Sequence, residues 1–258
     1  PNYDNNVPFY ESDILEKNKH LWADSKDVSK SVLLKRKIWV DNSLVELINS
    51  NIKFNNNGKP ITPIKTGIKG RGLLGRFGPN HAADAIVTRI NPSNSYDIQF
   101  VSTKRLDTGE WCIPGGMVDA GESISQTLKR EFIEEVASEN NEEIINEIFK
   151  DGDILYTGPT YGDPRTTDDA WIETCVKNFH IDQYLSEQLK LTPQLKENSK
   201  VQWVSCDVET LFGDHKKFIE LAKNNVIKKY KLNLKNDESN IYNQSYKFIE
   251  RIMGQNYL

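Results

Sequence analysis

The stretch that decides the fold runs from residue 116 to residue 135 and reads GMVDAGESISQTLKREFIEE. The pattern predicts a helix over 123–137, because a serine at its start can cap the first turn and apolar residues recur at helical spacing. Successive residues turn by about 100° around a helix, so Glu131, Glu134 and Glu135 share one face. We expect the opposite side to pack on a sheet through Phe132, Ile133 and Val136.

Three carboxylates on one helical face repel one another, at a cost of about 0.2–0.5 kcal/mol per pair. A divalent cation relieves this repulsion. Hard oxygen ligands suit Mg²⁺ or Mn²⁺, and these ions also bridge to the phosphates of a substrate. An ordinary solvated acidic face is the alternative, and the bare E-x-x-E-E spacing favours it. The surrounding sequence therefore has to decide between the two.

Strands and helices alternate along the rest of the chain. Strand patterns cover 84–90, 96–104, 111–118, 153–157, 170–181 and 200–205, and helical patterns cover 141–149, 214–230 and 238–253. This alternation, with a few antiparallel hairpins, predicts an α/β sandwich with a mixed β-sheet.

The first sixty-five residues differ in character from the remainder. They are polar and weakly periodic, and a turn at Asn55–Gly58 and two prolines follow their short apolar clusters. We interpret 1–65 as a small irregular N-terminal cap domain and 66–258 as the catalytic domain. A partly disordered leader is the alternative, although aromatic residues such as Trp22 and Trp39 need something to pack on.

The composition excludes several classes of function. The chain has 258 residues, with 33 Lys and Arg against 37 Asp and Glu and a net charge of −4, so it lacks the basic field of a nucleic-acid-binding protein. Its mean hydropathy of −0.61, with no apolar run of about 18 residues, argues against a membrane span.

Cysteines and histidines give no sign of a zinc site. The three cysteines are widely scattered and form no C-x-x-C motif, and the four histidines show no H-E-x-x-H. We expect reduced, buried thiols and an intracellular reducing compartment. The chain begins at Pro1 rather than Met, so targeting stays undecided between the cytoplasm and the mitochondrion.

One motif is misleading. Residues 70–75 read GRGLLG and fit G-x-G-x-x-G, but no strand pattern precedes them, and Gly78-Pro79 blocks the helix that a dinucleotide-binding fold requires. We expect a loop between the cap and the catalytic domain instead. Arg71 and Arg76 would then lie near the substrate cleft or on an acidic neighbour.

The pattern G-x5-E-x7-R-E-F-I-E-E, which includes Gly116, Glu122 and Arg130, resembles the Nudix box, the loop-helix-loop of the Nudix hydrolases. Ala137 and Ser138 depart from it, since the family has a glycine and an apolar residue there. Three further segments, 70–84, 109–116 and 163–171, are similar to animal ADP-ribose pyrophosphatases of this family. They are also similar to the homologous C-terminal domain of ADP-ribose-gated melastatin-type cation channels.

The resemblance implies a Nudix α/β/α sandwich and a Mg²⁺-dependent hydrolysis of ADP-ribose to AMP and ribose 5-phosphate. It further implies that Glu131, Glu134, Glu135 and the carbonyl of Gly115 hold the metal. Glu122 would assist through a second metal or its water shell. Arg130 would orient the glutamates by salt bridging.

Substrate-binding residues follow from the same resemblance. The strongest candidate is Arg165, whose guanidinium can fork onto phosphate or ribose oxygens; an ion pair with Asp163 or Asp168 is its ordinary alternative. The other candidates are the loop residues Asp163 and Asp168, His215 at the start of a late helix, and the strand residues Trp111 and Ile113, although such strand residues are more often core.

Two functions from different classes stay open. The chain can be an active hydrolase, or it can be an ADP-ribose-binding sensor domain that belongs to a longer channel polypeptide. Vertebrate channel domains of this type carry replacements at the positions of Glu131, Phe132 and Glu134, whereas all the acids are present here. The intact box favours hydrolysis.

Overall fold

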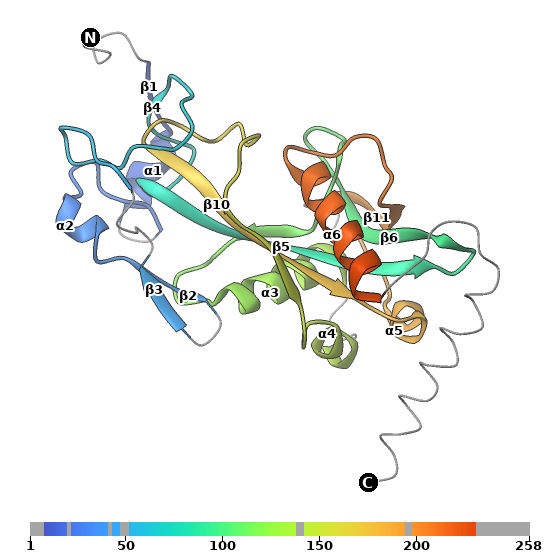
Figure 1. Cartoon of the computed structure of the whole chain (residues 1–258). Helices are drawn as coiled ribbons and strands as arrows, with labels where there is room; N and C mark the ends of the chain where they lie inside the picture. The colour runs from blue at the N-terminus through green and yellow to red at the C-terminus, as the bar shows by residue number, and fades with distance from the viewer. Residues whose placement is uncertain are drawn as a thin grey trace.

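A mixed β-sheet forms the centre of the molecule (Figure 1). The computed structural model describes residues 8–19, 22–40, 43–46, 52–137, 142–193 and 198–230. The main strands, in their spatial order, are β11 (Asn198–Ser205), β6 (Asn94–Arg105), β5 (Gly78–Asn91), β10 (Ala170–His180) and β9 (Asp153–Pro159). The pair β5 and β10 is parallel and the other neighbours are antiparallel. The prediction of a mixed sheet is therefore confirmed.

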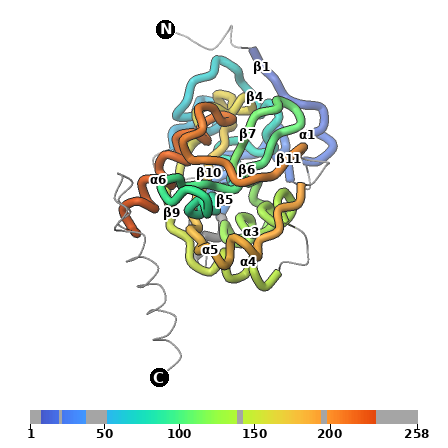
Figure 2. The backbone as a smooth tube through the Cα atoms, turned by 90° about the vertical axis from the view of Figure 1, so that its right-hand side faces the viewer, coloured from blue at the N-terminus to red at the C-terminus, as the bar shows by residue number. Residues whose placement is uncertain are grey.

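Helices cover both faces of this sheet, because the residues of its central strands alternate between two cores. Ala83, Ala85 and Val87 of β5 face a cluster with α3 (Ile124–Val136) and α4 (Glu142–Ile148). Ile86 faces the other side, where α6 (His215–Tyr230) packs. In Figure 2, α3 and α4 lie together on one side of the sheet and α6 lies apart from them.

The helix α3 begins with a capping box and ends at an extended residue. The Ser123 hydroxyl accepts from the backbone N–H of Gln126, while the Gln126 side chain accepts from the backbone N–H of Ser123, which completes a capping box. At the other end Ala137 is extended, with φ −117° and ψ 156°. The helix therefore ends without the left-handed residue that a glycine would supply.

Some strand and helix boundaries differ from the prediction. The expected strand 111–118 is split into β7 (Trp111–Cys112) and β8 (Gly115–Met117), because Pro114 has no N–H to give to a ladder. Its carbonyl instead accepts from the backbone N–H of Ala85 at 3.0 Å. A short helix, α5 (Gln183–Gln188), was not predicted. The expected helix 238–253 lies outside the described residues.

The N-terminal part contains short regular elements and lies at one end of β5 and β10 (Figure 1). They are β1 (Phe9–Glu11), α1 (Asp13–Lys17), α2 (Lys30–Leu33), β2 (Lys37–Val40) and β3 (Ser43–Glu46). Strand β1 pairs in parallel with β4 (Lys69–Gly72), and Leu33 of α2 is buried in the same core as α3. The domain division near residue 65 stays a prediction.

The segment that fits G-x-G-x-x-G is not a dinucleotide-binding loop. Its first three residues lie in β4, so the expectation of a loop was wrong for them, and no helix follows before β5 begins. Gly70 and Gly72 have φ angles of +87° and +58°, a region that suits glycine. Arg71 between them is buried and pairs with Glu11.

The state of the cysteines and the absence of a membrane-spanning helix were both expected from the sequence. Cys112, Cys175 and Cys206 are buried and form no disulfide, as expected of core thiols. Among the helices that the structure describes, none has both the length and the apolar character needed to cross a bilayer.

Phe132 anchors α3 to the sheet, since its side chain is fully buried and its ring centroid lies 5.2 Å from that of Phe149. We expect Phe132→Ala to lower the free energy of unfolding by about 3–5 kcal/mol, the usual cost of removing a buried aromatic ring. Urea denaturation measures this loss. Leu106→Ala, at a position that is 53% exposed, is the control; an equal loss in both variants would contradict the assignment.

Candidate functional site

Arg130 joins two glutamates of the acidic face to a glutamate of the loop that precedes α3. The guanidinium of Arg130 donates to Glu122 at 2.7 and 2.9 Å, to Glu131 at 2.7 Å and to Glu134 at 3.0 Å. It also donates to the carbonyl of Met117 at 3.0 Å. The predicted salt bridges between Arg130 and glutamates are therefore present, and the same side chain fixes the loop that precedes α3. That these bonds orient metal ligands stays a prediction.

Glu122 is the loop residue that this arrangement holds most firmly. Besides Arg130, the hydroxyl of Thr127 donates to its carboxylate at 2.8 Å and the backbone N–H of Asp119 at 3.3 Å. The hydrogen bond from Arg130 is the main reason that the pKa of Glu122 lies below its ordinary value, with burial acting against it. Glu122 is thus held as a carboxylate.

Two glycines bring backbone and carboxylates close together beside α3. A Cβ on Gly116 would lie 2.3 Å from Oε1 of Glu131, and a Cβ on Gly115 would lie 2.3 Å from Oδ1 of Asp84. Any side chain at these positions would displace a carboxylate. Glu135 lies nearby, within 3.5 Å of the Thr103 hydroxyl.

Asp84 is a site residue that the sequence did not reveal. It lies opposite Gly115 in the β5–β8 register, and the Thr174 hydroxyl donates to its carboxylate at 2.5 Å. Burial raises the pKa of Asp84 to about 6; the Thr174 bond and the charge of Arg165 oppose this rise, and the charge of Glu131 adds to it. Its place in a strand gave no pattern that distinguishes it from any other polar strand residue.

The donor set suits a hard divalent cation, since it consists of carboxylates and a glycine carbonyl. Within the described ranges, however, no three His, Cys, Asp or Glu side chains are close enough together to form a ready-made metal site. The carboxylates of Glu122, Glu131 and Glu134 point at Arg130 instead.

A cavity of about 490 Å³ adjoins the loop that Arg130 fixes. Its walls come from the 117–122 loop, from residues between 73 and 81, and from Arg165, and Trp22 and Lys37 complete them. It combines apolar surface, cationic groups and the acidic loop. Apolar walls with a few polar and charged groups are typical of small-molecule sites.

Arg165 reaches this cavity from the loop between β9 and β10. Its Nε and Nη2 donate to the two oxygens of Asp163 at 2.9 and 2.7 Å. Burial would raise the pKa of Asp163, but the bonds from Arg165 outweigh it and hold that pKa below its ordinary value. Arg76 also lines the cavity, whereas Arg71 pairs with the acidic Glu11. Arg71 thus lies on an acidic neighbour, which was one of its two expected places. That the cavity beside Arg76 is the substrate cleft stays a prediction.

Asp168 holds a turn. Its Oδ1 accepts from the backbone N–H groups of Thr66 and Gly67 at 2.7 and 3.1 Å, and from the Thr66 hydroxyl at 3.1 Å. It does not line the cavity. Its role in substrate binding stays a prediction.

His215, Ile113 and Trp111 form one contact group on the α6 side of the sheet. The ring nitrogen Nδ1 of His215 accepts from the backbone N–H of Ile113 at 2.8 Å. Ile113 is buried in the α6 core and Trp111 packs partly buried against it. None of the three lines the cavity, so their substrate-binding roles also stay predictions.

His81 is a further residue that the sequence did not indicate. It lies on β5 and lines the cavity. Its Nδ1 has no hydrogen-bond partner within the described part of the chain, and burial lowers the pKa of His81 to about 4. The imidazole is therefore neutral at physiological pH.

A model of the NUDIX domain family matches residues 79–222. The chain belongs to the Nudix family. The matched range includes all of β5 after its first residue, the 117–122 loop and all of α3. Nudix hydrolases generally use divalent metals, in agreement with the oxygen-rich donor set.

Several relatives share much of this sequence. The chain is 49% identical over 173 residues to putative nudix hydrolase 6 of Caenorhabditis elegans, an alignment that covers 64% of this chain and 63% of the relative. It is 42% identical over 189 residues to the mitochondrial ADP-ribose pyrophosphatase of Rattus norvegicus, covering 64% and 54%. The chain thus spans little more than half of their lengths.

A channel and a solved structure are also similar. A transient receptor potential cation channel subfamily M member-like 2 of Nematostella vectensis is 44% identical over 145 residues, which are 49% of this chain and 9% of the channel. The NUDIX domain of Shewanella oneidensis NrtR, in a structure described as complexed with ADP ribose, aligns with a TM-score of 0.44 and 22% identity, covering 57% of this chain and 88% of that one.

The environment of His215 predicts a pH effect on stability. Burial, followed by the charge of Arg105, lowers the pKa of His215 from 6.5 to about 4. Below pH 6.5 the unfolded chain therefore takes up a proton that the folded Nudix domain takes up only near pH 4, so stability falls over this window. We expect wild-type protein to lose about 1–2 kcal/mol more than His215→Asn between pH 7 and pH 5.

Urea denaturation at the two pH values measures this difference. The asparagine amide can still accept the Ile113 N–H bond but cannot take up a proton. His81 and His180, whose pKa values are also lowered to about 4, contribute equally to both proteins and cancel. Identical losses in the two proteins would contradict the assignment.

Proposed function

We propose that this chain is a Mg²⁺-dependent pyrophosphohydrolase that cleaves ADP-ribose to AMP and ribose 5-phosphate. The observation that carries this proposal is the Arg130-centred glutamate cluster, which fixes the 117–122 loop at the wall of a cavity that Arg165 also lines. The name of the rat relative, an ADP-ribose pyrophosphatase at 42% identity, supports the substrate.

The reaction transfers one phosphoryl group to water. The water oxygen forms a bond to one phosphorus, the bridging P–O bond breaks, and the bridging oxygen leaves with the other phosphate. One product is AMP, the other is ribose 5-phosphate, and the proton of the water passes to solvent or to a carboxylate. No oxidant or other co-reactant is needed.

Glu131, Glu134, Glu135 and the carbonyl of Gly115 would hold Mg²⁺, and Mn²⁺ suits the same donors. When bound, the ion polarises the pyrophosphate and lowers the pKa of a water molecule. Glu122 and Arg130 keep the loop and the glutamates in place, because their mutual bonds reach from Met117 to Glu134.

Arg165 and Asp163 are the proposed substrate contacts in the loop after β9. The Arg165 guanidinium is presented at the cavity in a fixed orientation by Asp163, and a fork of this kind suits two phosphate oxygens. Direct contacts of Asp168, His215, Trp111 and Ile113 with substrate remain part of the proposal.

A sensor domain is the second candidate, because a sea anemone channel is 44% identical over 145 residues. In that case ADP-ribose would bind without being cleaved. The presence of every glutamate of the cluster favours hydrolysis. Both a mitochondrial and a cytoplasmic location agree with the proposal.

Incubation with ADP-ribose, with and without Mg²⁺, tests the proposal directly. Chromatography follows AMP and ribose 5-phosphate while calorimetry records binding in parallel. We expect equal amounts of the two products, formed only with metal. Binding without products would overturn the hydrolase and favour the sensor.

Glu135→Gln tests the metal assignment within this function. The change is nearly isosteric but removes the negative charge, so we expect kcat to fall by at least about 100-fold. Circular dichroism and thermal melting show whether the protein stays folded. Full activity of this variant would refute a metal-binding role for Glu135.

Glu147→Gln is the matched control, since Glu147 is an exposed glutamate on α4. The same change of charge at that position should leave kcat and KM unchanged.

A further inference from the structure

An aromatic residue from the N-terminal part forms a wall of the cavity. Trp22 lines it, and its side chain is 43% exposed although a tryptophan is usually largely buried. An indole ring with an open face offers a large apolar contact to another planar ring. The function described so far gives Trp22 no role.

The indole of Trp22 packs against Gly75 so closely that no side chain fits at that position. A Cβ on Gly75 would lie 2.4 Å from the indole Cε3 and 3.0 Å from the Trp22 carbonyl. Gly75 is not among the glycines with positive φ in the described residues, so its backbone does not require a glycine. The missing side chain instead permits the close contact with the indole.

The residues after Trp22 are bonded to the same turn. The backbone N–H of Asp24 donates to the carbonyl of Gly75 at 2.8 Å, and the Asp24 carboxylate accepts from the backbone N–H of Phe77 at 2.8 Å. The other carboxylate oxygen pairs with Arg36. Hydrogen bonds therefore hold the backbone next to Trp22, and Gly75 contacts its ring.

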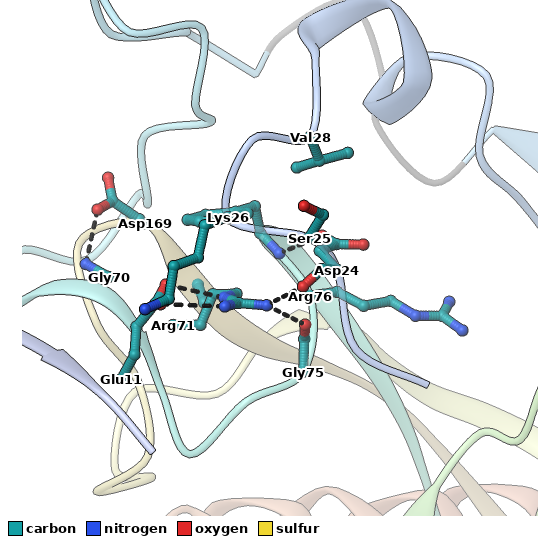
Figure 3. A network of polar contacts seen from close by, with 12 residues as sticks. Glu11, Asp24, Ser25, Lys26, Val28, Gly70, Arg71, Gly75, Arg76 and Asp169 are labelled. Carbon is teal, nitrogen blue, oxygen red and sulfur yellow. Dashed lines mark hydrogen bonds and ion pairs between the residues drawn. The ribbon is translucent and has the colours of Figure 1, made fainter. Parts of the chain in front are cut away.

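A buried ion pair lies beneath these contacts (Figure 3). Arg71 is 0% exposed and donates to the two oxygens of Glu11 at 2.8 and 3.0 Å, and its Nη1 donates to the carbonyl of Asp24. A buried charge is costly unless its partners stay in place. Arg71 thereby joins β1, the segment that carries Trp22, and the Gly75 turn.

The other walls indicate which part of a ligand faces Trp22. The cations of the cavity are Lys37, Arg76 and Arg165, and the 117–122 loop is acidic. A phosphate chain suits the region of the cations, because its negative charge pairs with theirs. The planar apolar part of the ligand would then contact the indole of Trp22.

We propose that Trp22 is a substrate-contacting residue that stacks on the purine base of a nucleoside diphosphate derivative, and that Arg71, paired with Glu11, positions it. This inference rests on the proposed function, since it names a contact of the same substrate site.

Steady-state kinetics of Trp22→Ala and Trp22→Phe test the contact. Loss of a base–aromatic stack should raise KM about tenfold, with kcat within twofold, and Trp22→Phe should restore most of the affinity. Product inhibition locates the contact: Ki for AMP should rise by the same factor as KM, and Ki for ribose 5-phosphate should not change. An unchanged KM, or an equal rise of both Ki values, would overturn the proposal.

Two further variants test how Trp22 is held in place, one at its contact with Gly75 and one at the partner of Arg71. Gly75→Ala places a methyl group where the ring lies, and Glu11→Gln leaves Arg71 without its counter-charge. Both should raise KM and Ki for AMP as Trp22→Ala does. A lower Tm of Glu11→Gln with an unchanged KM would show that Arg71 has only a structural role.

Glu16→Gln is the control for these changes. Glu16 pairs with Lys19 at the surface of the same N-terminal part, so its loss should leave KM and both Ki values as they are.

Calorimetric titration with AMP separates this inference from the proposed function. It measures binding without turnover, so it applies even to a chain that cleaves nothing. Weaker AMP binding by Trp22→Ala supports the stack whether or not ADP-ribose is hydrolysed. Equal AMP binding by the wild type and Trp22→Ala refutes the stack even where hydrolysis is observed.

Discussion

The bonds of Arg130 to three glutamates are the constraint on which the site depends. Glu131 and Glu134 would repel each other on α3, and Arg130 supplies the opposite charge between them. Because it also reaches Glu122 and the Met117 carbonyl, it ties the loop to the helix. The same contacts raise the pKa of Arg130 above its ordinary value, so its positive charge is permanent.

The walls of the cavity come from segments that are far apart in the chain. The 117–122 loop supplies an acidic wall, the loop after β9 supplies Arg165, and Trp22 reaches in from the N-terminal part. Each is held by its own polar contacts, which use Arg130, Asp163 and Arg71 respectively. Charged side chains thus fix the walls, and the sheet behind them gives the common support.

Local patterns predicted α3 almost to the residue, since its cap, its apolar face and its acidic face all lie within a few turns of chain. The salt bridges of Arg130 to glutamates were expected from the resemblance to the Nudix box. The bond between His215 and Ile113, and the place of Asp84 opposite Gly115, could not be predicted. These contacts depend on strand register and helix docking, which join residues with no periodic relation in sequence. The contact of Trp22 with Gly75 is of the same kind.

Calorimetric titration of the chain with Mg²⁺, without nucleotide, tests the central claim that the acidic face of α3 binds a divalent cation. The account predicts saturable binding that weakens by more than about tenfold in Glu131→Gln. In Glu143→Gln, a variant of equal charge at an exposed position of α4, binding should be unchanged. Equal affinity of Glu131→Gln and wild-type protein for Mg²⁺ would contradict it.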